Sequence, residues 1–238
     1  PPAGAAHAFG TFAGAGGGGV SPAASGSALI LVFALMHGIE VRRGAQVQDG
    51  AVLLKVLLIL AFILTAVAAL APRSPDVVAP FSLPAFGVSL VWISFSYSGW
   101  NAAVYMSGEI RDAERTVPRS LMLGTLLVTL LYIALNAVFV FAAPVKELAG
   151  RLEVGRIAAR AVGGVFLEEA VAALVALVLI SSVSSLVMAG PRVVAKMADD
   201  GYLPPWLAMT DGPPRTAIAL QSALALLLLW PASFDMLL

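Results

Sequence analysis

Runs of uncharged, mostly apolar residues alternate with short clusters of charged residues along this chain, and the alternation predicts helices that cross a membrane. A helix needs about 20 predominantly apolar residues to cross the hydrocarbon core of a bilayer. Six spans are predicted on this basis, the first of them short, at residues 28–39, 51–71, 86–107, 121–143, 170–190 and 217–232.

The segments outside the predicted spans differ in character. Before the first span, Gly16–Gly19 and Pro22 oppose helix formation, so we expect a loop there, with the tail of an earlier span as the alternative. Residues 144–169 are amphipathic and predict surface helices. Residues 108–119 form a dense mixed-charge loop, for which a solvated surface and a salt-bridged gate are both open interpretations. Its charged residues are Glu109, Arg111, Asp112, Glu114, Arg115 and Arg119.

The third predicted span has small and polar residues at its centre, where a lipid-facing helix would carry Leu, Val and Ile. The central stretch reads Phe95-Ser96-Tyr97-Ser98-Gly99-Trp100-Asn101. Its helix propensity is poor, and hydrocarbon tolerates a helix break only where protein or a water-filled cavity satisfies the freed backbone groups. We therefore predict a break between about Phe95 and Trp100 that lines a substrate site. A small-residue face that packs closely on a neighbouring helix is an equal alternative.

The composition supports a membrane protein and excludes other classes. Hydrophobic residues make up 60% of the chain and charged residues 12%, with a mean hydropathy of +0.93. Soluble domains carry about 25% charged residues. We expect an all-α, multi-pass membrane protein with one transmembrane domain over residues 1–238. The zero net charge gives no indication of nucleic-acid binding, and the absence of cysteine excludes disulfides and thiolate metal sites.

The basic residues predict the orientation of the spans, because cytoplasmic loops carry an excess of Lys and Arg. Eight basic residues belong to the loops after Ile39, Ser107 and Gly190, and five belong to the opposite loops. The first group is Arg42, Arg43, Arg111, Arg115, Arg119, Arg192, Lys196 and Arg215; the second is Arg73, Lys146, Arg151, Arg156 and Arg160. We therefore expect the first group to face the cytoplasm.

Lys55 lies inside the second predicted span, where an ammonium group is costly and usually pairs or faces a cavity. Its long side chain could instead reach the headgroups, so snorkelling is an equal alternative. If Lys55 is buried, it can replace a bound sodium ion or exchange a proton during transport. We predict that its ammonium lies near a serine cluster in the fifth span, and a side chain that points to the headgroups would favour snorkelling.

That cluster consists of Ser181, Ser182, Ser184 and Ser185. Ser181, Ser184 and Ser185 share one helix face through their spacing. Such hydroxyls often bond only to the preceding turn or to a neighbouring helix, while the functional alternative is a polar strip at a coupling site. His7 and His37 lack partners at metal-ligand spacing, and no catalytic motif is present. We expect no enzymatic activity, no metal and no cofactor.

Four stretches in a fixed order resemble the amino acid–polyamine–organocation permeases. Residues 44–49 with Lys55 resemble the start of the family's fifth helix, and residues 95–101 resemble its unwound sixth helix. Residues 108–119 resemble the charged loop that follows, with Ala113 where proline is usual, and Ala189–Arg192 with Asp200–Pro204 resemble the end of the eighth helix and its loop. The resemblance covers the chain from about Leu29 to its end.

This resemblance implies a five-plus-five inverted repeat with the substrate bound between two broken helices. It implies that Phe95 gates the pocket, and that Ser96, Tyr97, Ser98, Gly99, Trp100 and Asn101 line or support it. Backbone carbonyls of this helix would face the substrate's amino group. Lys55 would stand where sodium-coupled relatives hold an ion, against Ser181, Ser182 and Ser185. In this register the chain contains helices four to nine, so we expect that it was cut from a longer protein.

Two functions remain open at this point. The first is secondary transport of an amino acid or related amine across the plasma (cell inner) membrane by alternating access, either proton-linked or by exchange. The second is a truncated, non-transporting membrane fragment with a structural or interaction role, which the missing first helix favours. Lys55 argues against a sodium ion at its position, because an ammonium repels the ion. The particular substrate and the oligomeric state do not follow from the sequence.

Overall fold

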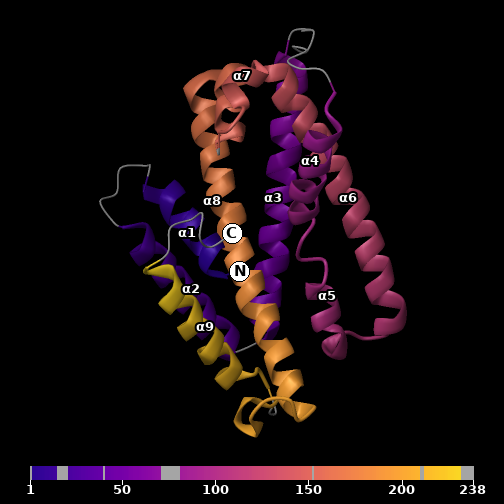
Figure 1. Ribbon diagram of the computed structural model, residues 1–238, viewed down its shortest axis with the longest axis vertical. Helices are drawn as coiled ribbons and strands as arrows, with labels where there is room; N and C mark the ends of the chain where they lie inside the picture. Colours follow the sequence, from indigo (N-terminus) through magenta and orange to yellow (C-terminus); the bar gives the residue numbers. More distant parts are fainter. Residues whose placement is uncertain are drawn as a thin grey trace. The chain divides into compact units, whose positions relative to one another are not determined.

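The computed structural model describes residues 2–14, 21–39, 41–70, 81–151, 153–209 and 212–231, which form helices and connecting turns with no strand among them (Figure 1). The helices are α1 (Pro2–Gly14), α2 (Pro22–Ile39), α3 (Val41–Ala69), α4 (Leu83–Ser96), α5 (Ala102–Tyr105), η1 (Ser107–Glu109), α6 (Ala113–Ala142), α7 (Val145–Leu148), α8 (Val154–Asp199), η2 (Pro205–Leu207) and α9 (Arg215–Leu229). The all-α prediction is confirmed.

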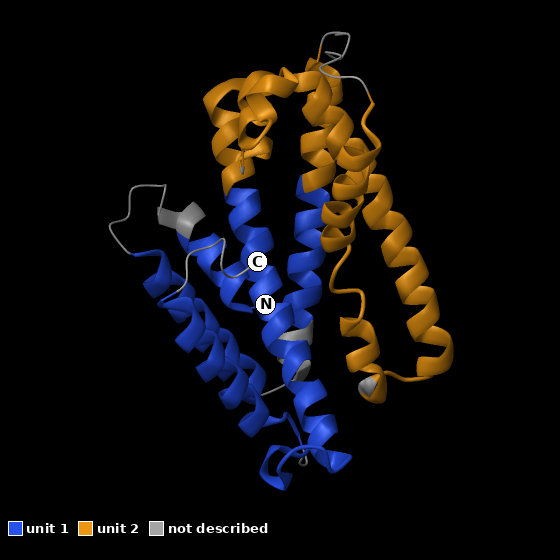
Figure 2. Ribbon diagram, viewed as in Figure 1, with its two compact units in different colours: residues 1–58, 173–238 blue, residues 59–172 orange. Residues whose placement is uncertain are grey.

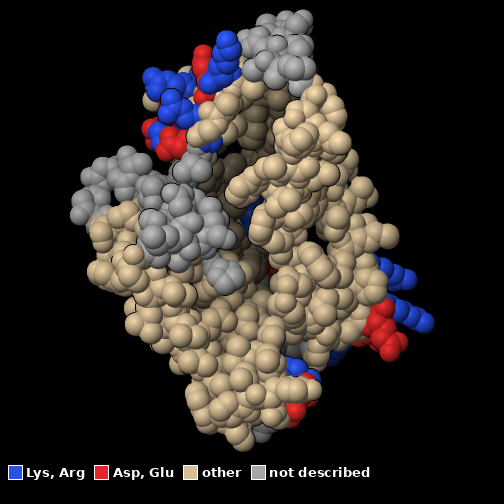
Figure 3. All heavy atoms as spheres, viewed as in Figure 1, with Lys and Arg blue, Asp and Glu red and all other residues tan. Residues whose placement is uncertain are grey.

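Four of the described helices are long and apolar enough to cross a membrane. They are α2, residues 46–69 of α3, α6 and α8. The apolar helices α4 and α9 are shorter, with 14 and 15 residues. On the face drawn in Figure 3, the Lys, Arg, Asp and Glu side chains gather in a few patches and leave most of the remaining surface uncharged. Such a surface suits helices that are surrounded by lipid.

The chain divides into two compact units (Figure 2). Unit 1 comprises residues 1–58 and 173–238, and unit 2 comprises residues 59–172. The division falls within α3 and α8, so each of these helices contributes to both units. The two predicted site regions fall in different units, because Lys55 and the serine cluster belong to unit 1 and residues 95–101 belong to unit 2.

The core of unit 1 is built by α1, α2, α8 and α9 at close range. Small residues permit this packing: a Cβ atom on Gly26 of α2 would lie 2.8 Å from the carbonyl oxygen of Ala6 in α1. The two backbones therefore nearly touch, as in membrane helix pairs that use small residues. The buried apolar side chains around this contact are Ala3, Ala6, Ile30, Phe33, Val183, Val187, Ile218, Ala225 and Leu229.

The loop expected before the first span is wrong over residues 2–14, which form α1 and favour the alternative of an earlier span, and α2 begins at Pro22 rather than at residue 28. Glycine weakens an isolated helix in water. Here Gly10 and Gly26 lie where a Cβ atom would collide with the neighbouring helix, so close packing compensates for poor propensity. Residues 16–19 lie outside the described part of the chain.

Unit 2 contains α4, α5, α6, α7 and the first part of α8. Helix α6 begins at Ala113, so the second half of the predicted charged loop is helical. Its charged side chains are exposed at Arg111, Asp112, Glu114, Arg115 and Arg119, which favours the solvated-surface interpretation. The side chain of Glu109 lies outside the described residues.

The predicted surface helices within residues 144–169 are present as α7 and the start of α8. Helix α8 is kinked where Gly163 and Gly164 leave helical geometry, and Gly164 has a φ of 68°. Ion pairs connect the segments on either side of the kink, because Glu168 contacts Arg156 at 3.0 Å and Arg160 at 3.3 Å. The kink therefore lies between a short, charged helix and the long, uncharged stretch of α8 over residues 170–190.

Candidate functional site

A break in the third predicted span is the main local feature of unit 2. Helix α4 ends at Ser96, a turn follows, and α5 begins at Ala102. Gly99 in the turn has a φ of 103°, a conformation that residues with a side chain rarely adopt. The break predicted between Phe95 and Trp100 is confirmed, and its cause is local, because serine, glycine and asparagine all favour turns over helix interiors.

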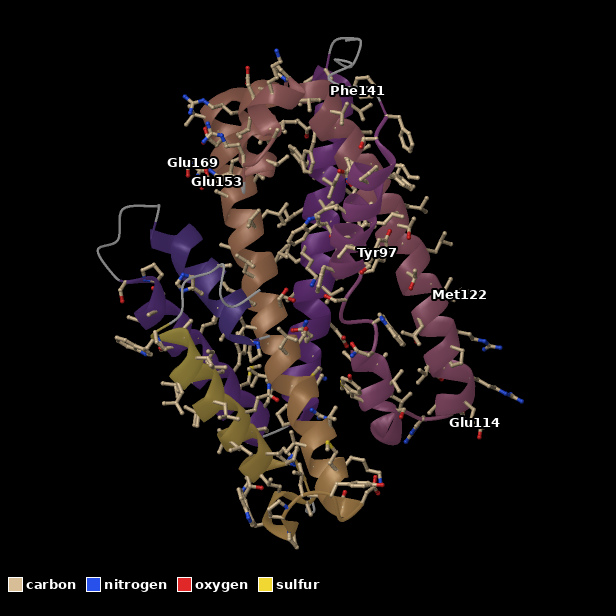
Figure 4. All side chains as sticks on the ribbon, viewed as in Figure 1. Tyr97, Glu114, Met122, Phe141, Glu153 and Glu169 are labelled. Carbon is tan, nitrogen blue, oxygen red and sulfur yellow. The ribbon has the colours of Figure 1, made fainter. Side chains whose placement is uncertain are left out.

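Helix α6 provides hydrogen-bond partners for two residues at the break. The Tyr132 hydroxyl donates to the Ser96 carbonyl oxygen at 2.9 Å, and the Tyr97 hydroxyl donates to the Thr129 hydroxyl oxygen at 3.0 Å. The rings of Tyr97 and Tyr132 meet edge to face with centroids 5.3 Å apart. Figure 4 shows Tyr97 where α4 ends and the chain leaves the helix. Side chains of α6 therefore hold the end of α4 in place.

The other predicted residues of this stretch are arranged less tightly. The side chains of Phe95 and Trp100 are 60% and 64% exposed, and Asn101 donates to the Tyr105 hydroxyl one turn later. The Ser96 hydroxyl donates to the Trp92 carbonyl oxygen of its own helix. Among the predicted site residues, Phe95 and Trp100 therefore have side chains that are accessible to a ligand. The Ser96 carbonyl group and the Tyr97 side chain instead contact α6.

Thr129 and Tyr132 contact the broken helix, and the sequence analysis did not single them out as candidate site residues. With Asn136 they form a polar stripe, spaced by three and four residues, within the uncharged part of α6. That stripe was a visible signal, since polar side chains in a span usually face protein rather than lipid.

In unit 1, Lys55 contacts the serine cluster as predicted. Its ammonium nitrogen donates to the Ser181 hydroxyl oxygen at 3.1 Å, and the side chain is half-buried. The contact joins α3 to α8 and is inconsistent with a side chain that extends to the headgroups. The predicted proximity is confirmed, whereas its role in coupling remains a prediction.

Gln48 completes this cluster and was not singled out by the sequence analysis. Its amide nitrogen donates to the Ser181 hydroxyl at 3.0 Å and contacts the Ser181 carbonyl at 3.3 Å and the Ser185 hydroxyl. Gln48 is 8% exposed and precedes Lys55 by seven residues, which places both on one face of α3. That spacing was the signal, and the cluster comprises Gln48, Lys55, Ser181 and Ser185.

The remaining two serines have other partners. The Ser182 hydroxyl donates to the Val178 carbonyl oxygen at 2.9 Å, so the structure does not bring it to Lys55. Ser184 lies 3.0 Å from His37 Nε2, and both residues are buried. The His37 ring also stacks on the Phe33 ring, so this histidine has partners in the fold that its position in the sequence did not indicate. No group of His, Asp or Glu in the described part of the chain could hold a metal ion.

We expect Gln48→Leu to lower the thermal unfolding midpoint of the purified full-length protein by several degrees. The substitution leaves Ser181 and Ser185 without their amide donor, and hydrogen bonds between membrane helices contribute about 0.6–1.7 kcal/mol each. Gln46→Leu, two residues away on the exposed side of α3, is the matched control and should leave the midpoint within about one degree. Equal midpoints for the two variants would show that Gln48 does not hold the cluster.

Comparison with known proteins places these features in a family. The sequence profile of a family described as amino acid permease matches residues 3–235. The branched-chain amino acid permease BcaP of Lactococcus lactis is 27% identical over 186 residues, which cover 73% of this chain and 40% of the relative. The methylthioribose transporter of Bacillus subtilis is 26% identical over 183 residues, covering 74% and 38%. The human large neutral amino acids transporter small subunit 2 is 30% identical over 123 residues, covering 49% and 22%.

The chain thus spans at most about 40% of the length of these relatives. The family match nevertheless covers nearly the whole chain, including the broken helix, Lys55 and the serine cluster. The resemblance noted from the sequence is confirmed, and the apolar helices agree with an integral membrane protein. The chain belongs to the amino acid permease family.

Proposed function

We propose that the protein containing this chain is a secondary transporter that moves an amino acid or related amine across the plasma membrane by alternating access. The break between α4 and α5 is the observation that carries the proposal, because transporters bind substrate at interrupted helices near the middle of the membrane. Family membership and the names of the relatives support the same class of function.

In this proposal the broken helix forms one side of the substrate site. The Ser98 carbonyl oxygen, which lies in the turn after α4, accepts the substrate's amino group, while the neighbouring Gly99 carbonyl already accepts from the Ala102 N–H at 3.0 Å. The exposed rings of Phe95 and Trp100 contact an apolar substrate side chain. Residues 81–107 contain no Asp or Glu, so this half of the site favours a neutral over a cationic substrate.

The cluster around Lys55 is the proposed coupling site. An ammonium at hydrogen-bond distance from Ser181 occupies the place where a sodium ion would otherwise be held, and repels that ion. Transport is therefore linked to protons or driven by exchange. Gln48 fixes the hydroxyl groups that Lys55 contacts, and a change in the separation of α3 and α8 would break the contact during the cycle.

Substrate binding can be tested by measuring the thermal unfolding midpoint of the purified full-length protein with each of the twenty amino acids and a set of simple amines. A ligand that binds only the folded state stabilises it, by about 2.7 kcal/mol at one hundred times its dissociation constant. We expect a subset of neutral amino acids to raise the midpoint and sugars to leave it unchanged. If no amino acid or amine raises the midpoint, the proposal that the substrate is an amino acid or related amine is contradicted.

A further inference from the structure

A groove between α2 and α9 in unit 1 has no role in the proposed transport site. The two helices pack side by side and border an open groove of about 620 Å³, within the range of roughly 300–1,000 Å³ typical of small-molecule sites. Apolar residues line most of it, including Leu31, Leu35 and Leu226. Arg215 and Ser222 are the two lining residues with polar side chains.

The groove has the length and polarity of one lipid molecule in a single leaflet. Eleven residues separate Arg215 at the start of α9 from Leu226, a distance of roughly 16 Å along a helix. This is about half of the ~30 Å hydrocarbon core. Arg215 stands at one end of the groove, Ser222 lies between the ends, and the opposite end is apolar.

Arg215 is held in a position that suits a phosphate group. Its Nε donates to the Gly38 carbonyl oxygen at 2.9 Å, at the C-terminal end of α2, and the side chain is exposed. A guanidinium carries five N–H donors, and those on its terminal nitrogens can bind a phosphate in a bidentate manner. By the count of basic residues, this end faces the cytoplasm, where anionic lipids attract basic pockets between helices.

Ser222 is a second, independent sign of a ligand. It is 6% exposed, and its hydroxyl has no hydrogen-bond partner among the described residues. A buried hydroxyl without a partner destabilises the fold unless a ligand or a water molecule supplies the missing hydrogen bond. Seven residues separate it from Arg215, roughly 10 Å along the helix, so it lies on the apolar side of the guanidinium, towards the middle of the groove.

We propose that the groove between α2 and α9 binds one anionic phospholipid of the cytoplasmic leaflet. Its phosphate contacts Arg215, an ester carbonyl accepts from the Ser222 hydroxyl, and one acyl chain lies along Leu35, Ile218 and Leu226. Charge complementarity at Arg215 selects an anionic headgroup. The site requires only that the chain spans a membrane, so it is independent of the transport proposal.

Native mass spectrometry of the purified full-length protein tests this proposal, with dioleoylphosphatidylglycerol and dioleoylphosphatidylcholine as probes. We expect the anionic lipid to bind about fivefold more tightly, since one Arg near the surface contributes a factor of that size. Arg215→Gln should remove this preference. Lys196→Gln is the matched control, because Lys196 is an exposed cation of the same predicted cytoplasmic side that does not line the groove, and it should keep the preference.

A second variant separates the groove from the rest of the lipid-facing surface. Ala219→Trp fills the groove without a change in charge, and we expect it to weaken the binding of both lipids to a similar extent. Equal binding of the two lipids to the wild-type protein, or unchanged lipid binding in both Arg215→Gln and Ala219→Trp, would overturn the proposal. So would displacement of the lipid by inorganic phosphate alone, or a loss of dimer mass in Ala219→Trp, which would assign the groove to a second copy.

Discussion

Lys55→Ala is expected to lower gradient-driven uptake of substrate by roughly 10- to 100-fold in proteoliposomes that contain the full-length protein. A hydrogen bond to a charged group contributes about 1.5–3 kcal/mol, and a contact of that strength made in only one state of the transport cycle sets the balance between states. In the structure this contact joins α3 to α8 through Ser181. The substitution removes the ammonium group that is proposed to link proton movement or substrate exchange to the movement of α3 against α8.

Lys196→Ala is the control for this prediction. Lys196 lies near the C-terminal end of α8, where its side chain is 67% exposed and pairs with Asp200 at 2.6 Å. Exposed ion pairs contribute little, about 0–1 kcal/mol, so uptake should stay within a factor of two. If Lys55→Ala transports as fast as the wild type and with the same dependence on the gradient, Lys55 has no coupling role and its contact with Ser181 is structural.

Gly99→Ala is expected to lower uptake about tenfold and to reduce the thermal unfolding midpoint. Gly99 has a φ of 103° in the turn that separates α4 from α5, and an alanine held with a positive φ costs about 1–2 kcal/mol. A Cβ atom at this position would meet no neighbouring atom, so the strain comes from the backbone alone. Relief of that strain would rotate the carbonyl groups that are proposed to face the substrate.

Gly87→Ala is the matched control, because Gly87 lies in the regular part of α4 and a Cβ atom there would also meet no atom. Alanine is the better helix former, so this variant should be as stable as the wild type or more stable by up to about 1 kcal/mol. The two substitutions add the same methyl group and should act in opposite directions. A Gly99→Ala protein with normal uptake and stability would show that the turn does not need its present conformation.

The break was predictable because its cause is local. Ser96, Ser98 and Gly99 all have poor helix propensity, and no tertiary contact is needed to foresee a turn among them. The approach of Lys55 to Ser181 was also predictable, since a charged side chain within a span needs a polar partner and the serine cluster offered one.

The partners of the break and the extent of the first helices were not predicted, because they depend on which helix faces meet. Tyr132 and Thr129 are polar residues of α6 whose role becomes clear only when α4 packs against them. Gln48 similarly contacts residues 133 and 137 positions away. A loop was the first expectation for the segment that forms α1, because propensity in water penalises glycine, while packing between membrane helices favours it.

The most direct test of the proposed function is uptake of a labelled amino acid mixture by the full-length protein in proteoliposomes, with a proton gradient, with preloaded substrate, and with neither. Transport of an amino acid predicts accumulation that follows the gradient or requires preloaded substrate, well above that of protein-free liposomes. A folded, correctly inserted protein that moves neither amino acids nor simple amines under any of these conditions would contradict the account and favour a non-transporting membrane protein.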